Sequence, residues 1–344
     1  MAKIVINGKL YAQRTTGVQR YSRELILELD NLVSGMDVEI ALPKNAVDVP
    51  DLKNIKLHYL GGNASIFWEQ VILPLYILKE RAVGLHVCSI VPIVKPDLVI
   101  LYDANALRNP QWFTKKLVAW YRMVHGAAAK HSKAIFTDSD FAKEELWQIF
   151  NINGKPIKNI GAGWQHLERV PYDENALQKH NLRKGDYFFC LGTRAPHKNM
   201  RWVCDHALKY PEENFAISGS MNSKIFGNEQ IELPANVHFL GYLSDSEIKT
   251  LMRDSKAFLF PSFYEGFGLP PLEAMSTGCP IIVSDIPVMH ENFGDAAHYI
   301  DPNNADVDLN RLLKNPVAAS TPILEKYSWK NCALKMYDKL KEFG

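Results

Sequence analysis

The stretch that decides the fold covers residues 256–285 and reads KAFLFPSFYEGFGLPPLEAMSTGCPIIVSD. Its apolar run Ala257–Phe260 is short and ends at a proline, which is typical of a buried strand. Two adjacent prolines then precede a helix predicted over 272–277, because proline suits a first helical turn. A second apolar run, 280–283, predicts another buried strand. Strand, glycine loop, helix and strand together form one unit of a parallel sheet.

The loop of this unit has the properties of an anion site. Backbone N–H groups and the helix dipole converge at the start of the helix, and glycines let a phosphate come close. These positions are Gly266, Phe267, Gly268 and Leu269. Two carboxylates, Glu265 and Glu273, flank the loop. Because carboxylates repel a phosphate, we expect them to accept hydrogen bonds from sugar hydroxyls instead. The pattern predicts a ligand with both phosphates and sugar hydroxyls; otherwise Glu265 caps the loop and Glu273 complements the helix dipole.

Strands and helices alternate along the whole chain, which predicts doubly wound parallel sheets of the α/β class. The predicted strands are 3–7, 38–42, 55–60, 85–90, 98–103 and 134–139, followed by 187–192, 215–219, 237–240, 257–260 and 280–283. The intervening segment 151–171 is rich in glycine and proline and lacks periodicity, so we expect the linker there. The predicted domains are therefore 1–165 and 166–326, followed by an amphipathic helix over 327–343.

Composition narrows the class of protein. The 344 residues are 47% hydrophobic and 22% charged, with a formal net charge of +1. This balance gives no support to nucleic-acid binding, which usually needs a clearly basic domain. Five scattered cysteines without metal-ligand spacing predict reduced thiols. We expect a cytoplasmic protein without a signal peptide or membrane span, and no metal site.

The segment from Glu265 to Glu273 resembles the E-x7-E signature of retaining glycosyltransferases of the GT-B fold, in the large family called GT4. Similar flanking segments cover most of the chain, strongly in the second half and patchily in the first. They are 67–70, 139–146, 192–199, 237–245 and 291–297. The resemblance implies two Rossmann-like domains that face a central cleft. It also implies that the final helix, 327–344, packs back on the first domain.

The resemblance further implies a nucleotide-sugar site on the second domain. Lys198 and Arg194 would bind the diphosphate, with Glu265 near the transferred sugar, and these three form the predicted catalytic set. The predicted donor-binding positions are Gly17, Gly192, Thr193, Tyr242, Gly266, Phe267, Gly268, Leu269 and Glu273. The chain departs from the family at Thr193, where many relatives carry an arginine, so either Arg194 replaces it or Thr193 contributes only a hydroxyl.

The first domain is expected to bind the acceptor. Tyr102 and Asp103 are the acceptor-side candidates, although the family usually has His-Asp where this chain has Tyr-Asp. The stretch 112–133 mixes aromatic and basic residues, a composition that can lie on an anionic membrane surface. Its alternative is an amphipathic helix with Trp120 and Val124 buried, and the two interpretations are compatible.

The leading prediction is a retaining, metal-independent hexosyltransferase of surface polysaccharide biosynthesis. Its donor would be a nucleoside diphosphate sugar, and its acceptor a glycan or lipid-linked glycan. GDP-mannose is the favoured donor because residues 265–275 resemble the corresponding segment of mannosyltransferases that build bacterial surface polysaccharides. No cofactor is expected. A nucleotide-sugar epimerase of the same fold and a non-catalytic nucleotide-sugar-binding protein remain the alternatives. The sequence does not predict the oligomeric state.

Overall fold

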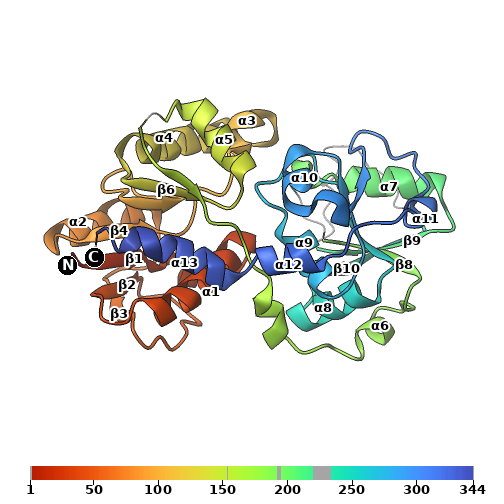
Figure 1. Ribbon diagram of the computed structural model, residues 1–344, viewed down its shortest axis with the longest axis horizontal. Coiled ribbons are helices and arrows are strands. Elements are labelled where there is room, and N and C mark those ends of the chain that lie inside the picture. Colours follow the sequence, from red (N-terminus) through yellow and green to blue (C-terminus); the bar gives the residue numbers. More distant parts are fainter. Residues whose placement is uncertain (1, 153, 192–194, 220–233, 344) are drawn as a thin grey trace. The chain divides into compact units, whose positions relative to one another are not determined.

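The computed structural model describes residues 2–152, 154–191, 195–219 and 234–343. The chain divides into two compact units (Figure 1). The first unit consists of Met1–Gly163 and Tyr327–Gly344, and the second of Trp164–Lys326. The boundary lies two residues before the predicted position at 165. Each unit is built around one parallel sheet, which confirms the predicted fold class, whereas the central cleft stays a prediction.

The sheet of the first unit has seven parallel strands in the order β3-β2-β1-β4-β5-β6-β7. The strands are β1 (Ile4–Asn7), β2 (Val38–Leu42), β3 (Lys56–Tyr59), β4 (Val83–His86), β5 (Leu98–Ile100), β6 (Ala134–Thr137) and β7 (Ile157–Asn159). The chain winds from β1 out to β3, returns to β4 beside β1, and then continues to the other edge. The reversal lies between β1 and β4, and ligands of such sheets bind at this point, beyond the carboxyl ends of the strands.

Helices cover both faces of this sheet. They are α1 (Gly17–Leu32), α2 (Leu73–Lys79), α3 (Asn105–Arg108), α4 (Lys115–His131) and α5 (Asp140–Phe150). Helix α1 connects β1 to β2 and helix α2 connects β3 to β4, and these two connections run across the sheet in opposite directions. Because parallel crossovers are right-handed, the two helices lie on opposite faces. Val5 packs with α2, and Val99 packs with α4 and α5. The strand register places both valines on one face, so α2, α4 and α5 share it.

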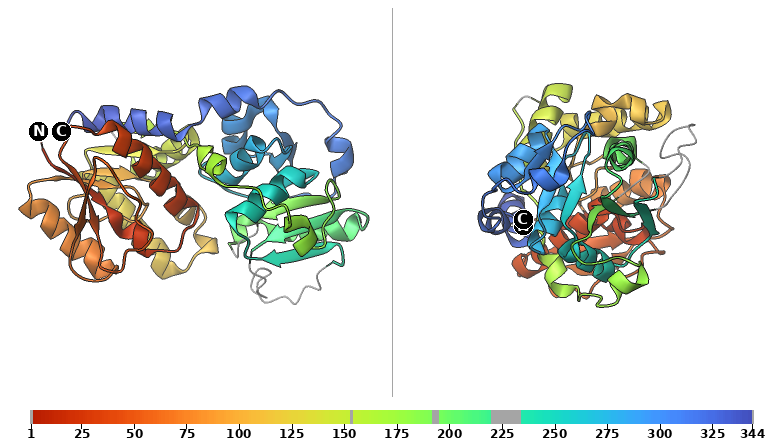
Figure 2. Two further views of the ribbon diagram at one scale, coloured as in Figure 1. Left: turned by 90° about the horizontal axis from the view of Figure 1, so that it is seen from below. Right: turned by 90° about the vertical axis from the view of Figure 1, so that its right-hand side faces the viewer.

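The final helix α13 (Trp329–Leu340) returns to the first unit and runs beside α1 (Figures 1 and 2). Ser328 caps its start by accepting a hydrogen bond from the Asn331 N–H at 3.1 Å. The Trp329 ring is 1% exposed and meets Tyr21 of α1 edge-on at 4.9 Å. A side chain at Gly163 would lie 2.3 Å from the Trp329 nitrogen. The chain therefore needs a glycine where it leaves the first unit.

The second unit contains a six-stranded parallel sheet in the order β10-β9-β8-β11-β12-β13. Its strands are β8 (Tyr187–Leu191), β9 (Asn214–Ser218), β10 (Val237–Gly241), β11 (Ala257–Phe260), β12 (Ile281–Ser284) and β13 (His298–Ile300). Every residue of β11 is buried, as expected for a central strand covered on both faces. Strand β11 pairs with both β8 and β12, so the loops that follow these strands emerge at one edge of the sheet.

Several helices of the second unit follow the loops at this edge of the sheet. They are α6 (Ala176–Lys179), α7 (Met200–Lys209), α8 (Asp245–Asp254), α9 (Leu269–Ser276), α10 (Pro287–Phe293), α11 (Leu309–Leu312) and α12 (Thr321–Lys326). Met200, Trp202 and Val203 of α7 pack on Phe188 and Leu259 of the sheet in one buried cluster. Helices α7 and α9 begin directly after the loops that follow β8 and β11, so both helix starts lie near the carboxyl edge of the sheet.

Several predicted elements differ from the structure. The segment expected as a linker contains strand β7, which extends the first sheet, and a 3-10 helix over Gln165–Arg169. Strand β4 begins at Val83 and ends at His86, not at 85–90, because the predicted range ran into the loop beyond the strand. Helix α9 begins at Leu269, three residues earlier than expected, so both prolines lie inside its first turn. Helix α2 is preceded by a π-helical turn over Trp68–Ile72.

Candidate functional site

Lys198 and Glu265 form an ion pair at the carboxyl edge of the second sheet. Lys198 ends a 3-10 turn after β8, and Glu265 lies in the loop after the neighbouring strand β11. The Lys198 Nζ donates to both carboxylate oxygens of Glu265, at 2.6 and 2.9 Å. The two side chains are 18% and 11% exposed. The structure therefore brings two of the three predicted catalytic residues into contact.

Hydrogen bonds fix the Lys198 loop against the Glu265 loop. The Phe263 N–H donates to the His197 carbonyl at 2.8 Å. The Asn199 side chain donates to the carbonyls of Pro261 and Pro302, at 2.9 and 2.8 Å, from a left-handed backbone conformation with φ of +54°. Burial and the neighbouring Lys198 lower the pKa of His197 to about 4. The imidazole is therefore neutral at pH 7, and among the described residues of this loop the positive charge is that of Lys198.

The glycine loop before α9 is held in one conformation. Gly268 has a φ of +96°, and a side chain there would lie 2.9 Å from Cε of Met289. The buried Asn292 side chain donates to the Phe267 carbonyl at 2.7 Å. Because the prolines at 270 and 271 have no N–H, the backbone donors of this helix start are limited to positions up to Leu269. These are the positions at which the sequence predicted an anion site.

Glu273 has a partner that the sequence did not reveal. His166 lies in the segment expected to be a linker, and its Nε2 is 2.9 Å from Oε1 of Glu273. Both side chains are nearly buried, at 2% and 12% exposure. This contact fixes the direction of the Glu273 carboxylate. A histidine in an aperiodic segment gives no periodic signal that could have identified it.

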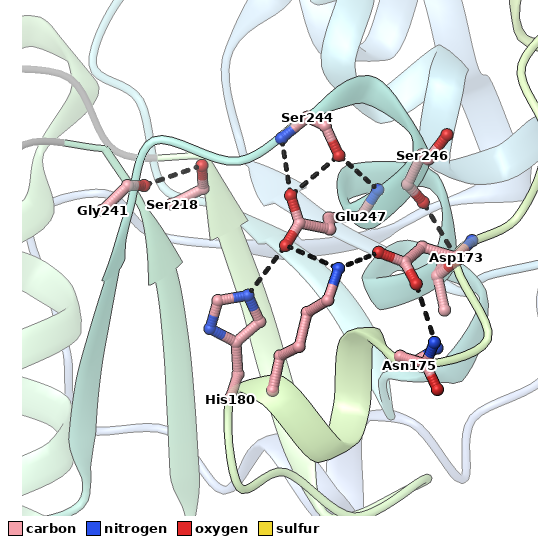
Figure 3. Close-up of polar contacts among 10 residues, drawn as sticks. Asp173, Asn175, His180, Ser218, Gly241, Ser244, Ser246 and Glu247 are labelled. Carbon is pink, nitrogen blue, oxygen red and sulfur yellow. Dashed lines mark hydrogen bonds and ion pairs between the residues drawn. The ribbon is translucent and has the colours of Figure 1, made fainter.

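Two predicted donor-binding residues, Gly192 and Thr193, and the third predicted catalytic residue, Arg194, lie outside the described residues. Tyr242 directly follows β10 and is 67% exposed. The next helix, α8, starts with a capping box in which Glu247 accepts from the backbone and hydroxyl of Ser244 (Figure 3). Glu247 also contacts His180 at 3.3 Å, which ties this helix start to the α6 region. These hydrogen bonds fix the start of α8, and therefore the end of the β10–α8 connection that contains Tyr242.

The first unit has its own cavity, of about 250 Å³, at the carboxyl end of β1. Lys9 and Glu69 line it and form an ion pair of 2.6 Å, and Asn7 donates to the same carboxylate at 3.1 Å. Glu69 is 2% exposed and lies in the π-helical turn, a feature often found at functional sites. Burial raises the pKa of Glu69, against the opposing effect of Lys9. The segment 67–70 was noted in the sequence, but no role was predicted for Glu69.

The two acceptor-side candidates have different surroundings. Asp103 lines the cavity, and its Oδ1 accepts a hydrogen bond from the Asn105 N–H at 2.8 Å. Tyr102 is 5% exposed, and its hydroxyl donates to the Val87 carbonyl at 2.7 Å. Its ring also meets Tyr21 edge-on at 4.9 Å. Packing thus accounts for Tyr102, whereas Asp103 lies where it can meet a ligand.

Gly17 is the first residue of α1. A side chain built there would meet nothing within 4 Å, and its backbone is not left-handed. Neither packing nor backbone conformation within the described residues therefore requires a glycine. Across the described ranges no group of three or more His, Cys, Asp or Glu side chains could hold a metal ion. Among the same residues, no helix has the length and apolar character needed to cross a membrane.

Each of the two parallel α/β units has a Lys–Glu ion pair at the carboxyl edge of its sheet, the edge at which ligands of such sheets bind. Residues 173–320 match the family described as "Glycosyl transferases group 1". The chain is 28% identical over 324 residues to O-antigen chain mannosyltransferase RfbU of Salmonella typhimurium, covering 88% of this chain and 87% of that protein.

Another curated relative is O-antigen chain mannosyltransferase B of Escherichia coli, 27% identical over 263 residues, which covers 70% of this chain and 68% of that protein. Among solved structures, sucrose-phosphate synthase from Thermosynechococcus elongatus superposes with a TM-score of 0.74 at 16% identity, covering 100% and 99% of the two chains. The chain is a glycosyltransferase of the GT-B fold that carries a group 1 glycosyltransferase domain.

Proposed function

We propose that this enzyme transfers a mannosyl residue, with retention of configuration, from a nucleoside diphosphate sugar to a glycan acceptor of surface polysaccharide biosynthesis. The observation that carries the proposal is the Lys198–Glu265 ion pair beside the glycine loop of α9. It combines a cation, a carboxylate and backbone donors at the edge of one sheet. The cation and the backbone donors can bind a diphosphate, and the carboxylate can accept hydrogen bonds from sugar hydroxyls.

Lys198 is the group that acts on the leaving diphosphate. In the structure its charge is balanced by Glu265. A bound diphosphate takes over this balance, and the Glu265 carboxylate then accepts hydrogen bonds from the hydroxyls of the transferred sugar. As the bond between sugar and diphosphate breaks, negative charge grows on the phosphate oxygens. A fixed ammonium group and helix-start amides stabilise that charge most in the transition state.

Glu273 binds the nucleotide ribose in this proposal. Its contact with His166 orients one carboxylate oxygen, and the ribose hydroxyls donate to the other. Lys198, the amides of positions 266–269 and Arg194 supply the positive field that a metal ion supplies in other diphosphate sites. The reaction therefore proceeds without a required metal. Gly17 leaves open space at the start of α1, which suits a close approach of the donor to the backbone.

The names of the two curated relatives support mannose as the sugar, and we propose GDP-mannose as the donor. A nucleotide-sugar epimerase and a non-catalytic nucleotide-sugar-binding protein are the alternatives. A thermal-shift comparison of UDP, GDP and dTDP, followed by incubation with the matching hexose donors, tests the proposal. We expect stabilisation by GDP and mannosyl transfer to a mannose-containing oligosaccharide. Ring isomerisation, or binding without turnover, contradicts it.

We also propose peripheral contact with an anionic membrane through residues 112–133. Val124 of α4 is buried, as the amphipathic interpretation expected, but Trp120 is only half-buried. Lys115, Lys116 and Arg122 are exposed. The same sheet face carries the exposed apolar side chains Phe67 and Leu75, at 62% and 61%. Basic and apolar groups on one face suit an anionic lipid surface. Co-sedimentation with anionic vesicles should fall with salt; equal binding to neutral vesicles argues against it.

A further inference from the structure

The cavity of the first unit is lined by groups that recognise sugar hydroxyls. It lies at the carboxyl ends of β1 and β4, where the strand order reverses. Amide, hydroxyl and carboxylate side chains line it, including Gln13, Thr16, Tyr121 and Asp103. Burial, and to a lesser extent Asp103, raise the pKa of Tyr121 to about 12, so its hydroxyl stays protonated and can donate. Its volume of about 250 Å³ is below the roughly 300–1,000 Å³ of pockets for drug-sized ligands, so it suits a single sugar ring.

The charges of the cavity disfavour a phosphate. Lys9 is the only basic residue among the described residues that line it, and Glu69 already balances its charge at 2.6 Å. Asp103 adds a second carboxylate, which leaves the lining with a net negative charge. The start of α1 favours an anion through its dipole, although the Gln19 side chain already accepts the Thr16 N–H there at 3.2 Å.

Stability does not explain why a charged pair is buried at this position. Removing two charges from water costs about as much as their attraction returns, so a well-packed apolar pair would serve the fold equally well. The Asn7 side chain holds both partners, since Nδ2 donates to Glu69 and Oδ1 accepts from the Lys9 N–H at 3.1 Å. The pair is thus held in one geometry at the floor of a cavity, which is the arrangement expected of a binding site.

A second lysine–carboxylate cluster in the same unit provides the contrast. Lys3 lies at the other end of β1 and binds Glu39 at 2.8 Å and Glu80 at 3.1 Å. It has the same chemistry as the Lys9 pair, but none of its residues lines the cavity. A substitution of Glu39 is therefore a matched control for a substitution of Glu69, because both carboxylates pair with a lysine but only Glu69 lines the cavity.

We propose that the Lys9–Glu69 cavity binds one uncharged sugar unit of the acceptor. Glu69 and Asp103 accept hydrogen bonds from its hydroxyls, while Lys9 and Tyr121 donate. The proposal rests on the proposed glycosyl transfer and sharpens it, because it selects a neutral glycan end over a sugar phosphate or the phosphate of a lipid carrier as the group held here. Asn7 is a positioning residue, since it orients the ion pair.

Ligand-observed saturation-transfer NMR on the full chain, with excess GDP present to occupy the proposed donor site, tests this inference. The neutral probes are methyl α-mannoside, methyl α-galactoside and methyl N-acetylglucosaminide, and the charged probes are mannose 6-phosphate and glucose 6-phosphate. We expect a signal from at least one neutral glycoside and none from the phosphates. Glu69→Gln and Asp103→Asn should each weaken that signal, with binding roughly tenfold weaker or more. Glu39→Gln should leave it unchanged.

Thermal unfolding of each variant shows whether it is folded. If Glu69→Gln does not fold, the double variant Lys9→Met/Glu69→Gln, which removes both charges together, and Asp103→Asn decide the question. The inference is wrong if the phosphates bind as well as the neutral sugars, if no neutral probe binds, or if folded variants keep the full signal. Nucleotide-induced thermal shifts, measured in parallel, report on the proposed donor site alone, so the two proposals can fail separately.

Discussion

Two lysine–glutamate pairs with the same separation of 2.6 Å lie at the carboxyl edges of the two sheets, Lys9–Glu69 and Lys198–Glu265. Their surroundings differ. The first pair lies on the floor of a cavity lined by amides, hydroxyls and a further carboxylate. The second lies beside a glycine loop and the starts of α7 and α9. If both proposals hold, the same ion pair binds a neutral sugar in one setting and a diphosphate in the other. The second pair lies beside the backbone donors of a glycine loop, whereas at the start of α1 the Gln19 side chain already accepts the Thr16 N–H.

The largest effect should come from Lys198→Ala. If Lys198 stabilises the departing diphosphate, turnover should fall by about 10²–10³, as when one transition-state donor is removed. Because the Glu265 carboxylate is largely buried, the loss of its ammonium partner should also lower the unfolding temperature, so rates are compared at a temperature at which the variant stays folded. Lys184→Ala is the matched control, since Lys184 pairs with Asp254 at 3.3 Å before the amino end of the same strand β8. The measurement is the steady-state rate of each variant at a saturating donor concentration. Equal losses of rate in both variants would contradict a specific role of Lys198 at the carboxyl edge of the sheet.

Glu273→Gln tests the proposed contact between Glu273 and the nucleotide ribose. We expect weaker binding of both nucleotide and nucleotide sugar, by about 1.5–3 kcal/mol, because one hydrogen bond to a charged group is lost. Glu213→Gln is the control, since Glu213 forms a comparable buried pair with His206 at 2.7 Å, and neither residue belongs to the proposed donor site. Calorimetric titration with the nucleoside diphosphate measures the difference. An unchanged affinity in Glu273→Gln contradicts the assignment.

Gly268→Ala tests how strongly the fold requires the glycine loop. The positive φ and the 2.9 Å approach to Met289 predict a destabilisation of about 1–3 kcal/mol. Gly17→Ala should stay within about 0.5 kcal/mol of the wild type, because its added methyl group meets nothing within 4 Å. Urea unfolding of both variants gives the comparison. Similar losses would show that the first-unit loop is also under steric constraint.

The smallest effect is a pH dependence in the wall of the first-unit cavity. Burial lowers the pKa of His125 to about 4, and the ring contacts the carbonyl of Ser89, which lines the cavity. An unfolded histidine titrates near 6.5, so stability is present above that pH and is lost as the pH falls toward 4, by about 1–2 kcal/mol at pH 5. His125→Gln should remove this part of the loss, measured by urea unfolding at pH 7.5 and pH 5. An unchanged slope would mean that His125 titrates with the same pKa in the folded and the unfolded protein, which contradicts the lowered pKa.

Local sequence predicted most of the sheet because buried parallel strands are short apolar runs with sharp ends. Strands β2 and β11 have the predicted bounds. Strand β7 was missed, since its three half-buried residues carry no continuous apolar signal. Glu265 and Glu273 were singled out because the glycines and prolines around them form a recognisable helix start. His166 was not found, since its partner Glu273 is 107 residues away.

The sequence by itself determined two parallel α/β units and the glycine loop of α9, because periodicity, turn residues and helix starts act over a few neighbouring residues. Only the tertiary structure decided which charges meet. Lys198 is 67 residues from Glu265, and Lys9 is 60 residues from Glu69. Strand order and register bring these side chains together, and no local pattern encodes strand order. The chemistry of each site therefore depends on the fold, whereas the elements that build the fold can be predicted from the chain.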